Sequence, residues 1–407
     1  ENRATRRDMI AVHAAGYYSA LDAGVQTVMA SYNSWTDLAA GKGYGKMHGN
    51  RELLTDVLKG RLGFDGVVVS DWDAIEQVAG CTKSHCPQAI NAGIDMVMVP
   101  EQWKAFIANT VADVRAGRIP MRRIDDAVTR ILRVKLRSGL FDAAPSASAY
   151  NGRADALLAS ELAREAVRKS AVLLKNDRDV LPLARDKKIL VIGQSADSFP
   201  NQTGGWSLTW QGTENSNGDF TTGSTLLGAL RKVLGTGNVV YSPDGKGVDP
   251  AQFAAVVAVL GERPYAEYKG DLTYPVTLQH SVRYPADLAA LQAVSGKGAP
   301  VVSVLYSGRT VYSNDLLNLS DAFVAAFLPG TEADGLADLI LRKADGVAGH
   351  DFSGKLPFAW PGSACTTSDG ADMGMLFARG YGLSYANPKR VGQLPVAASV
   401  DCGATAQ

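Results

Sequence analysis

Apolar residues fall in short, continuous runs that alternate with stretches of helical spacing. In the N-terminal third of the chain, three such runs indicate buried strands, and the segments between them indicate helices. Continuous apolar strands that alternate with helices are typical of a parallel sheet covered on both faces. The expected strands are 25–32, 66–70 and 94–99; the expected helices are 50–62, 103–116 and 124–138, with a glycine-rich loop before the first helix.

The same alternation resumes after a stretch rich in alanine, serine and proline at 143–153, whose composition is that of a linker. A helix is expected at 154–169. Helical stretches separate most of the later apolar runs, which predicts a second α/β domain with an open, mostly parallel sheet. Its expected strands are 172–174, 189–192, 239–241, 256–260, 301–305 and 323–327.

The predicted organisation is therefore a first α/β domain at 1–142, a linker and helix at 143–170, a second domain at 171–390 and a tail at 391–407. Three strand–helix units cannot close an eight-stranded barrel, which takes about 250 residues. The first domain is either a small open sheet or part of a barrel.

Charge and composition narrow the class of partner. The chain has 41 Lys and Arg residues and 41 Asp and Glu residues, so its formal charge is zero. This balance does not favour nucleic acid or an anionic membrane as a partner, and a neutral molecule fits at least as well. No apolar run approaches the roughly 18 residues of a membrane helix.

Four cysteines allow three pairings. Cys81 and Cys86 flank a short polar stretch, which predicts a local disulfide and, with it, a periplasmic or secreted protein. The alternative is a zinc site, but only His85 lies nearby and no second Cys/His pair follows. The pairing of Cys365 and Cys402 stays open.

Acidic and aromatic side chains follow the second expected strand directly. Asp71 and Asp73 stand on either side of Trp72. In α/β folds ligands bind at the carboxyl ends of strands. A carboxylate beside an indole suits a sugar, because the carboxylate can meet the anomeric carbon while the indole packs on the C–H face. The alternative is that Asp71 caps the next helix.

Two loops of the second domain also carry candidate residues. Trp206 and Trp210 lie in a polar, glycine-rich stretch, where exposed aromatic rings can stack on sugars; the alternative for one of them is to anchor the loop. Glu262 and Glu267 follow the strand expected at 256–260, and the alternative for this segment is a solvated charged loop. The nucleotide-binding glycine motifs and the Gly-x-Ser-x-Gly elbow are absent, and the five histidines show no metal spacing.

Taken together, these segments resemble family 3 of the glycoside hydrolases, in particular the exo-acting β-glucan glucohydrolases of plants and Gram-negative bacteria. The resemblance implies that the first domain is the C-terminal part of a (β/α)8-like barrel, that the second is an (αβ)6 sandwich, and that the active site lies in the crevice between them. The matching segments occur in family order at 63–72, 91–96, 170–176, 204–212, 261–271, 354–361 and 380–385.

By this resemblance Asp71 is the nucleophile and Glu267 is the acid/base, with Glu262 as a rival whose alternative role is hydrogen bonding within its loop. No metal or organic cofactor is implied. The implied substrate-binding residues are Trp72 and Trp210, which sandwich the sugar on the leaving-group side, Met29 and Tyr32, which line the glucose pocket, and Glu1, which approaches the glucose.

Two departures from the family pattern matter. The family's barrel carries an Asp, an Arg and a Lys-His pair upstream that grip glucose; this sequence does not contain them, so a missing N-terminal barrel segment is expected. Gln77 stands where the plant enzymes carry an arginine, which bears on substrate preference.

The resemblance implies a retaining β-glucosidase or β-glucan glucohydrolase that releases glucose by double displacement from a β-glucoside or β-glucan oligosaccharide. Its two carboxyl groups should lie about 5–5.5 Å apart. We expect Asp71 to be ionised, and we expect partial burial under Trp210 and repulsion from Asp71 to raise the pKa of Glu267. The alternatives are a β-xylosidase or N-acetylglucosaminidase of the same family, and a non-catalytic carbohydrate-binding protein.

Overall fold

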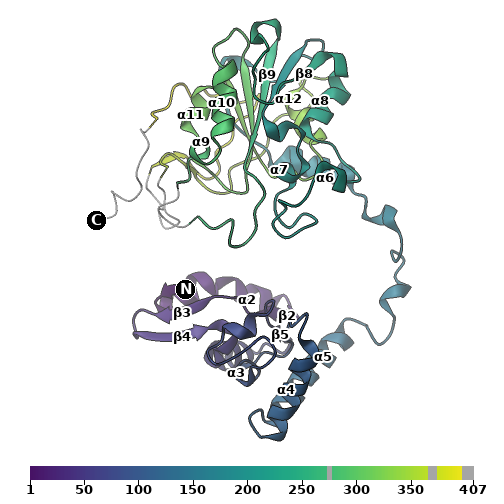
Figure 1. Cartoon of the computed structure of the whole chain (residues 1–407), viewed down its shortest axis with the longest axis vertical. Helices are drawn as coiled ribbons and strands as arrows, with labels where there is room; N and C mark the ends of the chain where they lie inside the picture. Colours follow the sequence, from purple (N-terminus) through teal and green to yellow (C-terminus); the bar gives the residue numbers. More distant parts are fainter. Residues whose placement is uncertain (273–276, 365–373, 397–407) are drawn as a thin grey trace. The chain divides into compact units, whose positions relative to one another are not determined.

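The computed structural model describes residues 1–272, 277–364 and 374–396 (Figure 1). The chain divides into two compact units, unit 1 (Glu1–Arg153) and unit 2 (Ala154–Gln407). Cys365 and Cys402 lie outside the described residues.

Two of the three strands expected in unit 1 are confirmed. β2 (Thr27–Met29) and β5 (Val67–Val69) pair in parallel. The third, expected at 94–99, is wrong as a strand, because only Met96 makes a bridge to Val69. The reason is Asp95: its carboxylate accepts the backbone N–H of Val68 at 2.9 Å, where a carbonyl of a regular parallel partner would stand.

The glycine-rich segment expected to be a loop after β2 contains regular structure instead. β3 (Ser34–Asp37) and β4 (Lys42–Lys46) pair antiparallel, and β1 (Asn2–Ala4) adds to β3 in parallel. Trp35 is buried, stacks on Tyr44 with ring centroids 4.5 Å apart, and donates its indole N–H to the carbonyl of Ala4. These aromatic contacts stabilise a small sheet, although the glycine content of the segment predicted a loop.

The longest helix of unit 1, α5 (Met121–Arg137), anchors β5. Arg130 on α5 donates to the carbonyls of Phe64 and Gly66 at 2.8 and 3.0 Å, and Arg133 donates to that of Asp65 at 2.7 Å, so the turn that enters β5 is held by one helix. The α-helices of unit 1 are α1 (Arg6–Asp8), α2 (Ala15–Asp22), α3 (Pro87–Ala92), α4 (Trp103–Arg115) and α5. Its π-helices are η1 (Met9–His13) and η3 (Glu52–Arg61), and its 3-10 helices are η2 (Met47–Gly49), η4 (Ala74–Gln77) and η5 (Pro145–Ala147).

All six strands expected in unit 2 are present and form one sheet, in the order β6-β11-β10-β9-β7-β8. Only β6 runs antiparallel to its neighbour, so the expectation of a mostly parallel sheet is confirmed. The strands are β6 (Val172–Asn176), β7 (Ile189–Ile192), β8 (Val239–Tyr241), β9 (Ala255–Gly261), β10 (Val301–Tyr306) and β11 (Ala322–Phe327).

Helices cover both faces of this sheet (Figure 1). In β9, Val257 and Val259 pack into a core shared with α6, α8 and α12, whereas Val256 and Leu260 pack into a second core shared with α10 and α11. This alternation explains why the whole strand is apolar. The helices are α6 (Ser160–Ser170), α7 (Phe199–Thr203), α8 (Leu226–Leu234), α9 (His280–Arg283), α10 (Pro285–Val294), α11 (Asn314–Asn318) and α12 (Asp334–Ile340).

Candidate functional site

In unit 1, Asp71 lies just past the carboxyl end of β5 and is held by its neighbours. Its backbone N–H donates to Nε2 of His48 at 3.0 Å, and one carboxylate oxygen accepts the N–H of Trp72 at 2.7 Å. The residue at the N-terminal cap position of the following turn, η4, is Asp73, whose side chain makes no capping hydrogen bond. The alternative that Asp71 is a helix cap is therefore wrong, and its half-buried carboxylate stays at the strand end.

His48 is a residue of this site that the sequence did not single out. It is buried, and burial lowers its pKa; the charge of Asp71 opposes this shift, and that of Lys46 adds to it. A neutral ring can accept the Asp71 N–H at Nε2, which requires the proton to sit on Nδ1. His48 thus orients the peptide of Asp71. It lies 23 residues earlier in the chain, and no local motif indicates the contact.

Four of the predicted unit 1 residues gather around this strand end. The Tyr32 hydroxyl donates to the carbonyl of Trp72, and Met29 is paired with Val69 at the end of β5. Trp72 and Met29 are 59% and 50% exposed, so both present apolar surface to a ligand.

Glu1 is placed differently. Its carboxylate accepts a hydrogen bond from the Thr36 hydroxyl at 2.5 Å, and this bond lowers the pKa of Glu1. The structure therefore ties Glu1 to β3, and among the described residues no hydrogen bond joins it to Asp71.

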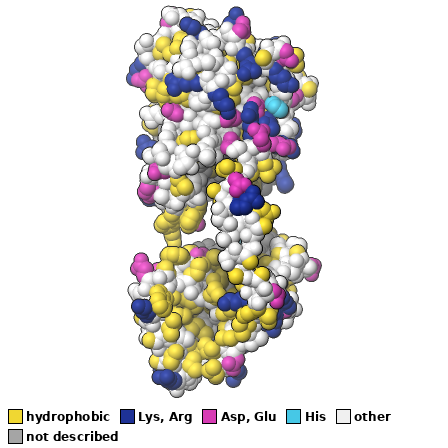
Figure 2. Space-filling model, turned by 90° about the vertical axis from the view of Figure 1, so that its right-hand side faces the viewer, with side chains coloured by type: hydrophobic (Ala, Val, Ile, Leu, Met, Phe, Trp, Pro, Cys, Tyr) yellow, Lys and Arg dark blue, Asp and Glu magenta, His cyan; other side chains and the backbone are white. Residues whose placement is uncertain are grey.

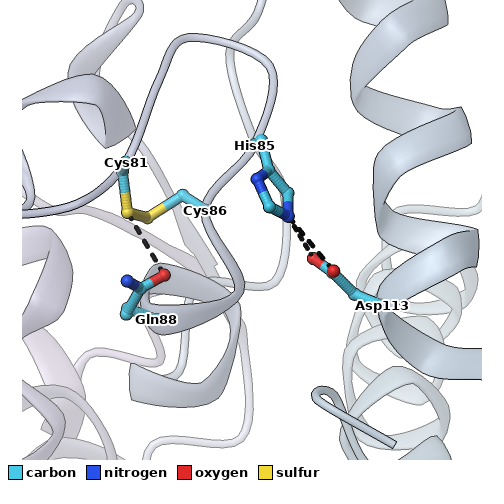
Figure 3. The surroundings of a disulfide bond; sticks show 5 residues. All are labelled: Cys81, His85, Cys86, Gln88 and Asp113. Atoms are coloured by element: carbon cyan, nitrogen blue, oxygen red, sulfur yellow. Dashed lines mark hydrogen bonds and ion pairs between the residues drawn. A yellow bond between two sulfur atoms is a disulfide. The ribbon is translucent and has the colours of Figure 1, made fainter. Parts of the chain in front are cut away.

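The predicted disulfide between Cys81 and Cys86 is present (Figure 3). Inside the closed loop, Lys83 makes an ion pair of 2.9 Å with Asp73, and the His85 ring bonds to Asp113 of α4 at 3.0 Å. The loop is thus tied both to α4 and to the turn that follows Asp71. Within the described residues no cluster of three or more His, Cys, Asp or Glu could hold a metal ion, so the zinc alternative has no support there.

Replacing both cysteines with serine is expected to lower the free energy of unfolding by about 2 kcal/mol, because the disulfide closes a short loop in the unfolded chain. Urea denaturation measures this. The unaltered chain with reductant should match the double variant measured with the same reductant, so that the remaining cysteines are in the same state in both. Equal stability of both proteins without reductant would contradict the expectation.

In unit 2, Glu267 follows β9 and meets both tryptophans of the glycine-rich loop. One carboxylate oxygen accepts the indole N–H of Trp206 at 2.9 Å and that of Trp210 at 2.7 Å. Both indoles are exposed, at 69% and 45%, and Tyr268 packs edge-on against Trp210 with ring centroids 6.0 Å apart. The loop therefore presents an aromatic surface with a carboxylate in it.

The expected effect of Trp210 on Glu267 is wrong in sign. The Glu267 side chain is exposed rather than partly buried. The hydrogen bond from Trp210, then one from the backbone of Glu267 itself and, more weakly, that from Trp206 lower its pKa. Donors to the ionised form favour it. Within unit 2, the indoles thus act as hydrogen-bond donors and not as a desolvating cover.

The carboxylate of Glu262 is buried and fully hydrogen-bonded to protein groups. It is 3% exposed, and its carboxylate accepts from Arg283 at 2.6 Å, from the Tyr265 hydroxyl at 2.9 Å and from the backbone N–H of Gly308 at 3.0 Å. These partners occupy both oxygens and, apart from Tyr265, lie outside the loop, which supports the alternative of a structural hydrogen-bonding role for Glu262.

Gln211 links two loops, the tryptophan loop (204–212) and the Glu267 loop (262–271), and the sequence did not single it out either. Its side chain is buried, accepts the backbone N–H of Ala266 at 2.9 Å and donates to the carbonyl of Glu267 at 3.0 Å.

No helix in the described part of the chain is both long and apolar enough to cross a membrane.

Two family models match this chain. The glycosyl hydrolase family 3 N-terminal domain matches residues 2–134, and the family 3 C-terminal domain matches residues 171–385. Each match covers the carboxylate site of one unit.

Named relatives agree with this match. A lysosomal β-glucosidase of Dictyostelium discoideum is 32% identical over 378 residues, which is 83% of this chain and 44% of the relative. A periplasmic β-glucosidase of Salmonella typhimurium is 29% identical over 392 residues, 85% of this chain and 48% of the relative. The chain spans about half the length of these curated relatives.

Among solved structures, an exo-1,3/1,4-β-glucanase from a Pseudoalteromonas species is 42% identical, with a TM-score of 0.88 over 98% of this chain and 50% of that chain. From the family matches to both units, this chain belongs to glycosyl hydrolase family 3.

Proposed function

We propose that the protein containing this chain is a retaining, exo-acting β-glucosidase or β-glucan glucohydrolase, with Asp71 as nucleophile and Glu267 as acid/base. One observation carries the proposal: in each unit a carboxylate stands beside an exposed indole in the segment that follows the carboxyl end of a parallel strand. The names of the relatives, two β-glucosidases and an exo-β-glucanase, support the same substrate class.

In the proposed reaction, the Asp71 carboxylate forms a bond to the anomeric carbon while the glycosidic C–O bond breaks, and Glu267 gives its proton to the leaving oxygen. Glu267 then takes a proton from water, which attacks the anomeric carbon, and the Asp71 carboxylate leaves. The indole N–H groups favour ionised Glu267, the form that the second step needs.

The proposed substrate contacts follow the surfaces of the two units. Trp72 and Trp210 are proposed to stack on the sugar of the leaving group, whereas Met29 and Tyr32, near the end of β2, line the glucose pocket. Glu1 is proposed to approach the glucose from the edge of β1.

We also propose that unit 1 is part of a (β/α)8-like barrel that further strand–helix units complete. A cavity of about 400 Å³ in unit 1 is lined by apolar residues of η1, α2, β2 and η3, such as Ile10, Tyr17, Val28 and Leu54. Figure 2 shows hydrophobic side chains gathered over one face of this unit. Apolar surface of this extent marks a contact area for other protein segments.

A periplasmic or secreted location is part of the proposal. The disulfide between Cys81 and Cys86 persists in an oxidising compartment, and one relative is named a periplasmic enzyme.

The proposed function is tested with p-nitrophenyl glycosides. The full protein should hydrolyse the β-glucoside and yield β-glucose as the first product, detected by NMR, because two displacements retain configuration. A preference for the β-xyloside or the N-acetyl-β-glucosaminide would replace the glucosidase proposal. Glucose binding without turnover of any of the three would indicate a non-catalytic binding protein.

Replacing Trp210 with alanine is expected to raise KM for cello- and laminari-oligosaccharides by about 2- to 12-fold, because aromatic stacking of this kind is worth about 0.5–1.5 kcal/mol. Steady-state kinetics measure this. Trp103, which is 49% exposed on α4, offers a matched control, and its alanine variant should keep KM unchanged. Equal KM values for both variants would mean that Trp210 does not contact substrate.

A further inference from the structure

We propose that Gln211 is a positioning residue that clamps the loop of Glu267 and so places the Glu267 carboxylate for its acid/base role. The inference rests on the proposed function and adds to it a residue that touches neither substrate nor the reacting atoms.

The contact itself is a two-point clamp. The buried amide of Gln211 accepts from the N–H of Ala266 and donates to the carbonyl of Glu267, so it engages the backbone on either side of the Glu267 Cα. Exchanging the amide oxygen and nitrogen would set donor against donor and acceptor against acceptor, so a single orientation satisfies both bonds. Two such bonds restrict the backbone more than either does alone.

Glycines make this close approach possible. A Cβ on Gly205 would lie 2.2 Å from the carbonyl oxygen of Tyr265, and a Cβ on Gly212 would lie 2.9 Å from the side chain of Pro264. Glycines near both ends of the tryptophan loop therefore let its backbone pack against residues 264–266. The two loops are in tight contact at three successive places: at Gly205, at Gln211 and at Gly212.

The clamp couples the position of Glu267 to that of the indoles. Trp210 precedes Gln211 in the chain, and its indole N–H reaches Glu267 Oε2 at 2.7 Å. The same short segment thus holds the backbone of Glu267 through Gln211 and its carboxylate through Trp210.

Side-chain contacts from outside both loops hold the base of the Glu267 loop, whereas its tip is closed by short backbone bonds from Lys269 N–H to the carbonyl of Glu267 at 3.0 Å and from Gly270 N–H to that of Ala266 at 2.8 Å. Glu262, at the beginning of the loop, is bound by Arg283, and Arg309 donates to the carbonyl of Gly270 at 2.5 Å at its end. Gln211 acts between these anchors, directly at Glu267. Removing it should leave the base of the loop in place and free the segment that carries the carboxylate.

Loss of the clamp should change the pKa of Glu267 as well as its position. When the clamp is lost, the carboxylate no longer stays at the two indole N–H groups, whose hydrogen bonds lower its pKa. The pKa of Glu267 should then rise toward the ordinary glutamate value of about 4.3. A misplacement of about 1 Å in an acid/base group can cost roughly 10²-fold in rate.

The first experiment needs no catalysis. Tryptophan fluorescence of the full protein is titrated between acid and neutral pH, and the transition due to Glu267 is identified by its loss in Glu267→Gln. We expect Gln211→Ala and Gln211→Glu to shift this midpoint upward. Gln202 is a matched control: it is fully buried and donates to the carbonyls of Ser224 and Gly330, outside the Glu267 loop.

Gln202→Ala should lower the thermal midpoint of unfolding and leave the fluorescence midpoint unchanged. If Gln211→Ala also lowers only the thermal midpoint, Gln211 merely stabilises unit 2 and the proposal is overturned. A native protein with no transition assignable to Glu267 overturns it too.

The second experiment is kinetic. For an alkyl β-glucoside with a poor leaving group, Gln211→Ala should lower kcat roughly 10- to 100-fold with KM changed less than about threefold, and Gln211→Glu, which keeps the acceptor, should fall between it and the unaltered enzyme. An equal loss for aryl and alkyl glucosides overturns the positioning role. Failure to hydrolyse any glycoside refutes the proposed function, while the fluorescence titration still decides whether Gln211 places Glu267.

Discussion

Replacing Asp71 with asparagine is expected to lower kcat by about 10⁴-fold or more, the order of loss seen when a central catalytic group is removed. Asparagine keeps an oxygen that can accept the Trp72 N–H, and the bond from the Asp71 N–H to His48 involves only the backbone of residue 71. The fold around β5 should therefore survive, and the loss should reflect chemistry. Stopped assays with p-nitrophenyl β-glucoside measure it.

Asp73 provides the matched control, since it is also an acid at this strand end but is paired with Lys83. Asp73→Asn should retain activity within about tenfold. For Asp71→Gly, added azide should restore turnover and yield the α-glucosyl azide, because azide fills the place of the carboxylate and only one displacement remains. Full activity of Asp71→Asn would refute Asp71 as the nucleophile.

Replacing Glu267 with alanine should have the second largest effect, and its size should depend on the leaving group. Alkyl glucosides need protonation of the leaving oxygen, so the loss for them should be about 10²–10⁴-fold, whereas the bond-breaking step for a dinitrophenyl glucoside should change little. Pre-steady-state kinetics with both substrates separate the two cases.

Glu214 is the matched control for this experiment. It is an exposed glutamate two residues after the tryptophan loop and accepts a hydrogen bond from Thr209 at 3.0 Å. Glu214→Ala should leave both substrates unaffected. Equal losses for the alkyl and dinitrophenyl glucosides in Glu267→Ala would remove Glu267 from the acid/base role.

The strands of unit 2 could be predicted because continuous apolar runs mark strands that are covered on both faces. Val256 to Leu260 is such a run, and its side chains fill two cores. The strand order was not predictable in this way, since β6 joins the far edge and runs antiparallel to β11. Pairing between distant segments depends on tertiary packing, which apolar content alone does not encode.

Unit 1 shows where local patterns mislead. Residues 94–99 are as apolar as a strand, yet the Asp95 carboxylate takes the place of a backbone partner for Val68. The glycines at 41, 43 and 45 suggest a loop, but two of them lie within β4, where Trp35 and Tyr44 stack and hold a small sheet. In both cases one side-chain contact outweighs the average tendency of the segment.

The sequence by itself determined the family, the α/β class of both units and the identity of the candidate acids, because motifs at strand ends are local in the chain. Only the tertiary structure decided their surroundings: His48 behind Asp71, and Gln211, Trp206 and Trp210 around Glu267. The sign of the pKa shift at Glu267 belongs to this second group. It depends on whether an indole covers the carboxylate or donates to it, and that is a matter of distance and direction between residues more than 50 positions apart.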